Sequence, residues 1–275
     1  MVLEGKRIVL TGGAGGIGQL LAQRLVDKGA LVGILDRDAM ALAQISQACA
    51  HPRHLVTAAV DLLDETARNT ALAELLSRLG GIDVLINNAG IQYFKPFVEQ
   101  EPVELERLLR LNLAVPMLLI RGVLPSMLAQ GSGQIVNVGS TFGSIGFAWF
   151  AAYSASKAGL RGLSEALRRE LRETGVGVTY IAPRAARTPL NTSAVMRMAV
   201  AVKMNMDAPE WVAQQIVRAL ERERKEVYLG FPESWFVRVN AVLPRLVDLA
   251  LRGQNRLMER FARETSTGKK TGESV

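Results

Sequence analysis

Tyr153 and Lys157 stand four positions apart at the start of the helical run AGLRGLSEALRRELRE, a spacing that places two side chains on one helix face. A free phenol has a pKa of about 10 and is a poor acid–base catalyst at neutral pH. A lysine ammonium at about 4 Å, with an effective dielectric of about 20, favours the phenolate by about 4 kcal/mol. The pair therefore predicts proton transfer by Tyr153, with its pKa lowered by Lys157. Alone, the same spacing also fits a helix-start aromatic beside a surface charge.

A glycine loop is the second feature with chemical meaning. The stretch TGGAGGIG, residues 11–18, follows a β-rich run and opens the helical run QLLAQRLVDKG. Glycine permits a tight turn and lets backbone N–H groups approach a pyrophosphate, which then lies at a helix N-terminus. A merely flexible loop is the alternative. Asp36 follows at close to the roughly 20-residue spacing at which a carboxylate binds the adenosine ribose. Asp36 favours NAD, but Arg37 could pair with a 2′-phosphate and leaves NADP open.

The elements that must position these residues alternate between short apolar runs and longer amphipathic ones. Continuous apolar strands alternating with helices are typical of a parallel sheet covered on both faces. We therefore predict the α/β class, with a Rossmann-type doubly wound parallel sheet in a single domain that carries a C-terminal helical extension. The predicted strands cover 7–11, 31–35, 54–60, 82–87, 134–138, 176–182 and 226–229.

Taken in order, the motifs resemble those of the short-chain dehydrogenase/reductase family, from about residue 5 to about residue 230. The TGxxxGxG loop is Thr11, Gly12, Gly16 and Gly18; the NNAG motif is Asn87, Asn88, Ala89 and Gly90; the YxxxK motif is Tyr153 and Lys157. The resemblance implies hydride transfer between NAD(P) and a carbonyl or secondary alcohol, without a metal. The implied cofactor-binding residues are Thr11, Gly12, Ala14, Gly15, Gly16, Ile17, Gly18, Asp36, Arg37, Asp61, Leu62, Asn88, Ala89, Gly90, Tyr153, Lys157, Pro183 and Thr188.

The resemblance also implies a catalytic role for each of four residues, Asn112, Ser140, Tyr153 and Lys157. Tyr153 would exchange a proton with the substrate oxygen, and Ser140 would hydrogen-bond the same oxygen. Lys157 would hold the nicotinamide ribose and keep the phenol acidic. Asn112 would bind a water that links Lys157 to solvent. The two histidines, His51 and His54, lie near the predicted third strand and offer no support for a histidine mechanism.

One position departs from the family pattern. Arg184 follows Pro183 where the family has glycine, and arginine there would be strained if the backbone required a positive φ. We expect a slightly altered loop instead, with Arg184 or Arg187 near the cofactor phosphates or an acidic substrate.

The substrate side of the site is expected to be apolar. The resemblance implies a substrate lid over residues 190–208, whose methionines Met196, Met198, Met204 and Met206 form either an adaptable wall or ordinary packing. Aromatic residues between Ser140 and Tyr153 could line the same cavity, which favours a hydrophobic carbonyl or alcohol. These residues are Phe142, Phe147, Trp149 and Phe150.

Composition changes after Gly230, so we predict a catalytic domain over 1–230, an amphipathic helical extension over 231–264 and a polar tail over 265–275. Arg238, Arg245 and Arg252 recur every seven residues and predict a basic stripe, while Pro244 is expected to divide the extension into two helices. Such a basic amphipathic segment could lie on an anionic membrane, cap the substrate pocket or pack on a partner subunit.

The 275 residues carry a net charge of +7, which favours anionic partners, but the chain has no nucleic-acid motif and we expect no nucleic acid. Cys49 is the single cysteine and the chain opens without a leader-like run, so we expect a reducing, cytoplasmic location, with membrane association possible through 231–264. No stretch of about 20 uninterrupted apolar residues predicts a membrane span. The resemblance implies a homodimer or homotetramer. The alternatives are a catalytically idle NAD(P)-binding sensor or scaffold and a peripheral membrane protein.

Overall fold

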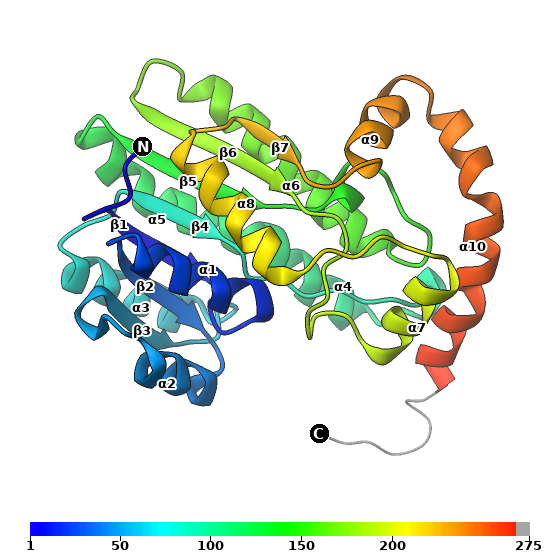
Figure 1. The fold of residues 1–275 in the computed structure, drawn as a ribbon, viewed down its shortest axis with the longest axis horizontal. Coiled ribbons are helices and arrows are strands. Elements are labelled where there is room, and N and C mark those ends of the chain that lie inside the picture. Colours follow the sequence, from blue (N-terminus) through cyan, green and yellow to red (C-terminus); the bar gives the residue numbers. More distant parts are fainter. Residues whose placement is uncertain (268–275) are drawn as a thin grey trace.

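The computed structural model describes the backbone of residues 1–267 and the side chains of residues 1–264. Seven strands form one parallel sheet in the order β3-β2-β1-β4-β5-β6-β7 (Figure 1). Strand order reverses between β1 and β4, and in such sheets ligands bind beyond the carboxyl ends of the strands at this reversal. The doubly wound sheet predicted from the sequence is confirmed. The strands are β1 Arg7–Thr11, β2 Leu31–Asp36, β3 Leu55–Ala59, β4 Val84–Asn87, β5 Gly133–Val138, β6 Val176–Ala182 and β7 Glu226–Tyr228.

Helices cover both faces of this sheet. One apolar core joins the strands to α1, α2 and α8, and a second joins them to α3, α5 and α6. The central strands β1, β4 and β5 are buried except for the first residue of β1 and of β5, because both faces of the sheet are covered. The helices of these two layers are α1 Gly16–Asp27, α2 Ala39–Ala48 and α8 Pro209–Glu221 on the first face, and α3 Glu65–Leu79, α5 Val115–Ala129 and α6 Ala151–Glu170 on the second.

The remaining helical segments are not part of these two layers. Asn112 lies in a five-residue π-helical turn that joins α4 to α5, and turns of this type are frequent at functional sites. These segments are α4 Pro102–Leu109, the π-turn Arg110–Ala114, α7 Ser193–Ala201, α9 Glu233–Val242, α10 Pro244–Thr267, and the short helices η1 Pro52–His54, η2 Phe97–Glu99 and η4 Thr141–Gly143.

The continuous helical stretch Pro102–Ala129 has 28 residues and is long and apolar enough to cross a bilayer by length and composition. In the fold its second half is α5, whose buried face packs against the sheet through residues such as Leu119, Val123 and Met127. A core helix of a layered α/β domain has the same composition. The apolar length of this stretch is therefore explained by its place in the second core.

The C-terminal extension forms two helices, α9 and α10, which meet at Pro244 as expected from the sequence. Because the chain turns there, Arg238 lies on α9 whereas Arg245 and Arg252 lie on α10, and the expected single arginine stripe is wrong. In Figure 1, α10 runs along the side of the molecule to α7. The predicted tail boundary is also wrong, because α10 continues to Thr267. The rest of that predicted tail, residues 268–275, lies outside the described residues.

Candidate active site

The glycine loop lies where β1 ends and α1 begins, and its tight geometry depends on glycine at two positions. Gly12 has a φ of 68°, and a Cβ there would lie 2.7 Å from the Ala89 Cα. A Cβ on Gly18 would lie 1.9 Å from the Gly12 carbonyl oxygen. No side chain caps the N-terminus of α1 at Gly15. The loop therefore presents backbone N–H groups and the positive end of the helix to the cleft, which suits a pyrophosphate.

Thr11 and Asn88 join the loop to the end of β4. The Thr11 hydroxyl oxygen accepts hydrogen bonds from the backbone N–H groups of Asn88 and Ala89, at 3.0 and 3.1 Å. The Asn88 amide donates to the carbonyl oxygens of Thr11 and Gly12. Thr11 is buried and is not among the residues that line the cleft, and its expected cofactor contact stays a prediction. It braces the two strand ends at the point of order reversal.

Asp36 ends β2 beside the loop. Its Oδ2 accepts a hydrogen bond from the Ala14 N–H at 2.9 Å, and its Oδ1 accepts one from the Asp38 N–H at 3.1 Å. These two bonds hold the carboxylate at the rim of the cleft. Arg37 and Asp61 also lie on this rim, and the Asp61 carboxylate accepts a hydrogen bond from the Leu63 N–H. This end of the cleft thus has the carboxylate that suits two ribose hydroxyls.

Ser140, Tyr153 and Lys157 converge on the same cleft from two elements. Ser140 follows β5, and its Oγ accepts a hydrogen bond from the Phe142 N–H at 3.1 Å. Tyr153 and Lys157 lie on α6, with the lysine Nζ 5.8 Å from the tyrosine ring centroid. The Lys157 ammonium donates to the Val138 carbonyl oxygen at 2.9 Å, which ties α6 to β5. A proton-transfer group and a hydrogen-bonding hydroxyl therefore lie side by side in the wall of the cleft.

Burial shifts the pKa values of these groups. Desolvation raises the pKa of the buried Tyr153 phenol to about 12, and a hydrogen bond with the Ser140 side chain partly opposes this rise. Burial lowers the pKa of Lys157 to about 8. The pKa of Tyr153 is therefore raised in the protein by itself, and the expectation of a lowered value is wrong. Desolvation of the phenolate is the largest effect here.

Asn112 lies behind this group and does not line the cleft. Its Oδ1 accepts from the Ile91 N–H, and its Nδ2 donates to the Ile91 carbonyl and to the Ser156 hydroxyl. A Cβ on Gly90 would lie 3.2 Å from Asn112 Oδ1 and 3.6 Å from Lys157 Nζ, so the three residues are neighbours. The side chain of Asn112 joins the loop following β4 to α6. The expected water link to Lys157 stays a prediction.

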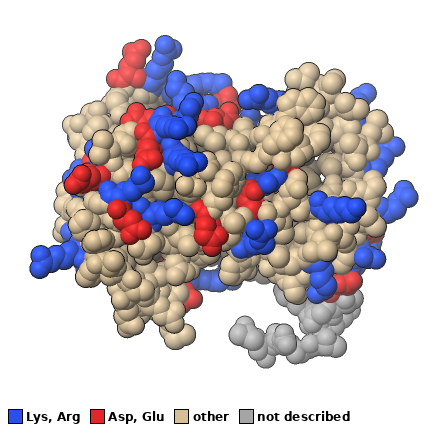
Figure 2. All heavy atoms as spheres, viewed as in Figure 1, with Lys and Arg blue, Asp and Glu red and all other residues tan. Residues whose placement is uncertain are grey.

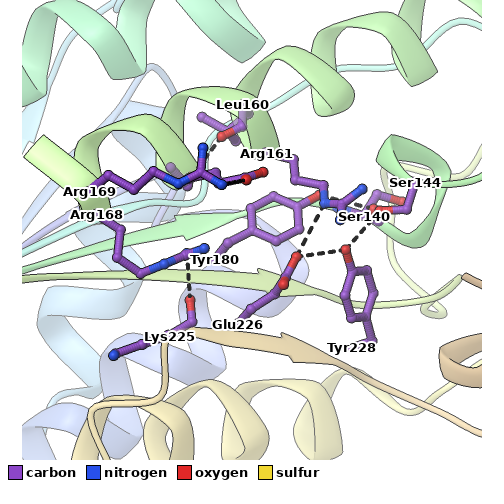
Figure 3. Close-up of polar contacts among 12 residues, drawn as sticks. Ser140, Ser144, Leu160, Arg161, Arg168, Arg169, Tyr180, Lys225, Glu226 and Tyr228 are labelled. Atoms are coloured by element: carbon purple, nitrogen blue, oxygen red, sulfur yellow. Dashed lines mark hydrogen bonds and ion pairs between the residues drawn. The ribbon is translucent and has the colours of Figure 1, made fainter. Parts of the chain in front are cut away.

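Tyr180 supports Ser140 from behind, a role that the sequence did not indicate. Its hydroxyl donates to the Ser140 carbonyl at 3.2 Å and accepts from the Ser140 N–H at 3.4 Å (Figure 3). A Cβ on Gly139 would lie 2.2 Å from the Tyr180 ring, so glycine there gives the ring its space. Figure 3 also shows the neighbouring Tyr228 hydroxyl bonded to Ser144 and Glu226. β6 and β7 thus hold both ends of the turn that carries Ser140.

The cleft has a volume of about 760 Å³ and extends from the glycine loop to an apolar end beyond Tyr153. Phe142 and Phe150 line it as expected, whereas Phe147 and Trp149 pack behind it. The Trp149 indole instead donates to the Asn255 carbonyl of α10 at 3.2 Å. Of the lid methionines, Met198 and Met204 line the cleft. Lining residues that the sequence did not single out include Gln92, Tyr93, Arg107, Leu190, Asn191 and Val195.

Arg184 lines the cleft, and its side chain also has a structural role that was not expected. Its guanidinium forms a two-bond ion pair with Asp207 and donates to Glu233 on α9 at 2.8 Å. Its backbone φ is not positive, so the condition under which arginine would be strained here is not met. The side chain joins the loop after β6 to the end of the lid and to the C-terminal extension. Arg187 donates to the Met206 carbonyl, so this arginine also holds the lid segment.

Apart from Thr11 and Asn112, the predicted site residues all line one cleft, and they come from loops distant in sequence. The lining residues that were missed sit in segments without a short motif, where only the chain path brings them to the site. Fold and cleft together define an α/β protein with a Rossmann-type parallel sheet and a cleft at the carboxyl ends of its strands.

Comparison with known proteins agrees with this class. Residues 6–199 match the family described as short chain dehydrogenase. The chain is 34% identical over 230 residues to the ketoacyl reductase HetN of a Nostoc species, covering 83% of this chain and 79% of that one. It is 36% identical over 246 residues to 2,3-dihydroxy-2,3-dihydro-p-cumate dehydrogenase of Pseudomonas putida, covering 86% and 91%. The structure of 3-ketoacyl-(acyl-carrier-protein) reductase from Brucella melitensis complexed with NADH is similar, with a TM-score of 0.76, 27% identity and coverage of 84% and 99%. The chain belongs to the short-chain dehydrogenase family.

Proposed function

We propose that the protein is an NAD(P)-dependent oxidoreductase that interconverts a carbonyl and a secondary alcohol on a hydrophobic substrate. The observation that carries the proposal is that Ser140, Tyr153 and Lys157 open into the same cleft as the glycine loop. Similar proteins include a ketoacyl reductase and a 2,3-dihydroxy-2,3-dihydro-p-cumate dehydrogenase, whose names agree with this reaction class. An idle sensor would not need the complete set of proton-transfer residues.

The cleft has groups that suit two parts of a dinucleotide, the pyrophosphate and the adenosine ribose. The glycine loop would hold the pyrophosphate, and Asp36 would accept hydrogen bonds from the adenosine ribose, which favours NAD over NADP. Arg37 on the same rim keeps NADP as the second choice. When bound, the nicotinamide supplies or accepts the hydride.

The residues of the chain provide the proton and the orientation. In the reductive direction, the protonated Tyr153 hydroxyl donates its proton to the substrate oxygen as that oxygen gains negative charge. The Ser140 hydroxyl stabilises the same oxygen by a hydrogen bond. Lys157 keeps a positive charge next to the phenol and limits the cost of its deprotonation. Phe142, Phe150 and Met198 exclude water from the apolar end and bind the carbon skeleton.

A thermal-shift titration with NADH and NADPH, followed by a panel of apolar ketones and ketoacyl esters, tests the proposal. We expect NADH to raise the melting temperature more than NADPH, and at least one apolar ketone to be reduced. If neither nucleotide stabilises the protein, the proposed function is wrong. If both stabilise it but no carbonyl is turned over, the sensor alternative is favoured.

A further inference from the structure

The C-terminal hairpin, defined here as α9, the turn at Pro244 and α10, has two apolar faces. The inner face is buried and includes Val237, Val247, Met258 and Phe261. Met258, Phe261 and Ala262 belong to the same core as Phe150 and Met198, which line the cleft. The inner face is therefore explained by its packing over the substrate end of the molecule, and the outer face is not.

The outer apolar face gathers at the tip of the hairpin, and every residue from 241 to 246 is exposed. The relative exposures are 77% for Val242, 54% for Leu243 and 55% for Leu246. Trp235 on α9 and Leu249 on α10 extend this surface at 55% and 53%. Single exposed apolar residues are ordinary, but a contiguous group at a projecting turn marks a contact surface. In Figure 1 this turn lies at the outer end of the hairpin, away from the sheet.

Arginines surround this apolar tip. Arg238, Arg245 and Arg252 are exposed, and none of them forms an ion pair with another described residue. Asp248 is the one acidic residue between Pro244 and Arg256. Figure 2 shows the hairpin side of the molecule as a largely uncharged surface with separate Lys and Arg groups. Apolar side chains at a tip, with cations around them, match the chemistry of an anionic lipid surface.

We propose that the tip of the C-terminal hairpin docks the protein onto an anionic lipid bilayer. Val242, Leu243 and Leu246 would enter the boundary between headgroups and acyl chains, while the arginines contact the lipid phosphates. A second copy of the chain is a poorer occupant, because an isologous contact through this tip would bring arginines together. Leu246 and Met258 lie about 18 Å apart along α10, so docking would hold the apolar end of the cleft near the bilayer. The docking itself does not depend on the proposed reaction.

The test is flotation of the full-length chain with vesicles of phosphatidylcholine and phosphatidylglycerol, compared with vesicles of phosphatidylcholine alone. One variant removes the apolar tip by Val242→Ser, Leu243→Ser and Leu246→Ser, and a second removes charge by Arg238→Gln, Arg245→Gln and Arg252→Gln. A matched control carries Val2→Ser and Arg78→Gln, an exposed apolar residue and an exposed arginine far from the hairpin. Circular dichroism melting and light scattering check the fold and the oligomer mass of each.

We expect the unaltered chain to float with the anionic vesicles and to be released by high salt, because screening weakens contacts with lipid phosphates. Each hairpin variant should partition at least about tenfold less, and the control should behave as the unaltered chain. Failure of the unaltered chain to float would overturn the proposal, as would equal flotation of either folded hairpin variant. A smaller oligomer mass in the tip variant would assign the surface to a subunit contact instead, and would also overturn it.

Discussion

The phenol of Tyr153 is the residue on which the proposed chemistry depends most directly. Its raised pKa of about 12 keeps it protonated near neutral pH, which suits a proton donor in carbonyl reduction. Proton donation then has to be made easier in the reacting complex, and the adjacent Ser140 and Lys157 are the groups placed to do so.

Replacing this phenol tests the assignment. We expect Tyr153→Phe to reduce kcat for ketone reduction by at least about 100-fold, because the substrate oxygen loses its proton donor. Binding of NADH, measured by thermal shift, should remain. A Phe variant that keeps full turnover would remove Tyr153 from the proposed reaction.

The pKa of Lys157 predicts how the activity depends on pH. Its ammonium is charged below its lowered pKa of about 8 and loses the proton as the pH rises through that value. We therefore expect kcat/KM for reduction to be constant at lower pH and to fall above about pH 8. A Lys157→Arg variant, whose charge persists, should lose this alkaline limb even if its rate is lower. The same alkaline limb in Lys157→Arg would show that another group titrates.

Tyr180 offers a test of how far the position of Ser140 matters. Tyr180→Phe removes both hydrogen bonds to the Ser140 backbone and leaves the ring in its place. We expect kcat to fall by about tenfold with little change in KM, because Ser140 is less well placed toward the reacting oxygen. Tyr228→Phe is the matched control, since that hydroxyl bonds Ser144 and Glu226. Equal effects of the two variants would indicate a general loosening of the turn.

At the scale of elements, Arg184 joins three segments: the loop after β6, the end of the lid at Asp207 and α9 at Glu233. We expect Arg184→Ala to lower the free energy of unfolding by about 2 kcal/mol, because the largely buried Asp207 loses its partner. It should also raise KM for apolar substrates, since the lid and the hairpin are held less firmly.

Arg197→Ala is the control for this prediction. Arg197 pairs with Glu264 between the lid helix α7 and α10, but both side chains are more than half exposed. Such a pair contributes about 0–1 kcal/mol, so the change should be small in urea unfolding. Equal destabilisation by the two variants would contradict a special role for Arg184.

At the scale of the whole molecule, we propose that exposed parts of α5 and α6 contact a second copy of the chain. Met117 and Leu118 are exposed on α5, and a Cβ on Gly162 of α6 would meet no atom within 4 Å. Small residues let helices approach closely, and this face is separate from the C-terminal hairpin. The homodimer or homotetramer stays a prediction.

Introducing a bulky charge on this face tests the assembly. We expect Gly162→Arg to reduce the mass measured by light scattering to that of a smaller species, because the arginine side chain prevents close helix contact. Gly253→Arg is the control, as Gly253 is also an open helical glycine but lies on α10. An unchanged mass in Gly162→Arg would place the subunit contact elsewhere.

The sequence by itself determined the sheet, the glycine loop and the placement of Tyr153 beside Lys157, because these depend on local requirements. Gly12 and Gly18 have no room for a Cβ, and four-residue spacing places Tyr153 and Lys157 on one helix face. Residues under such local constraints form short motifs that can be recognised in a sequence. The predicted strands follow from apolar runs in the same way.

Only the tertiary structure decided the role of Arg184, the support of Ser140 by Tyr180 and the two faces of the C-terminal hairpin. The partners of Arg184, Asp207 and Glu233, are distant in sequence, and their contact depends on where the lid and α9 meet. The raised pKa of Tyr153 likewise depends on burial by several elements. Long-range packing and desolvation are properties of the folded chain, so a local pattern such as the spacing of Tyr153 and Lys157 cannot reveal them.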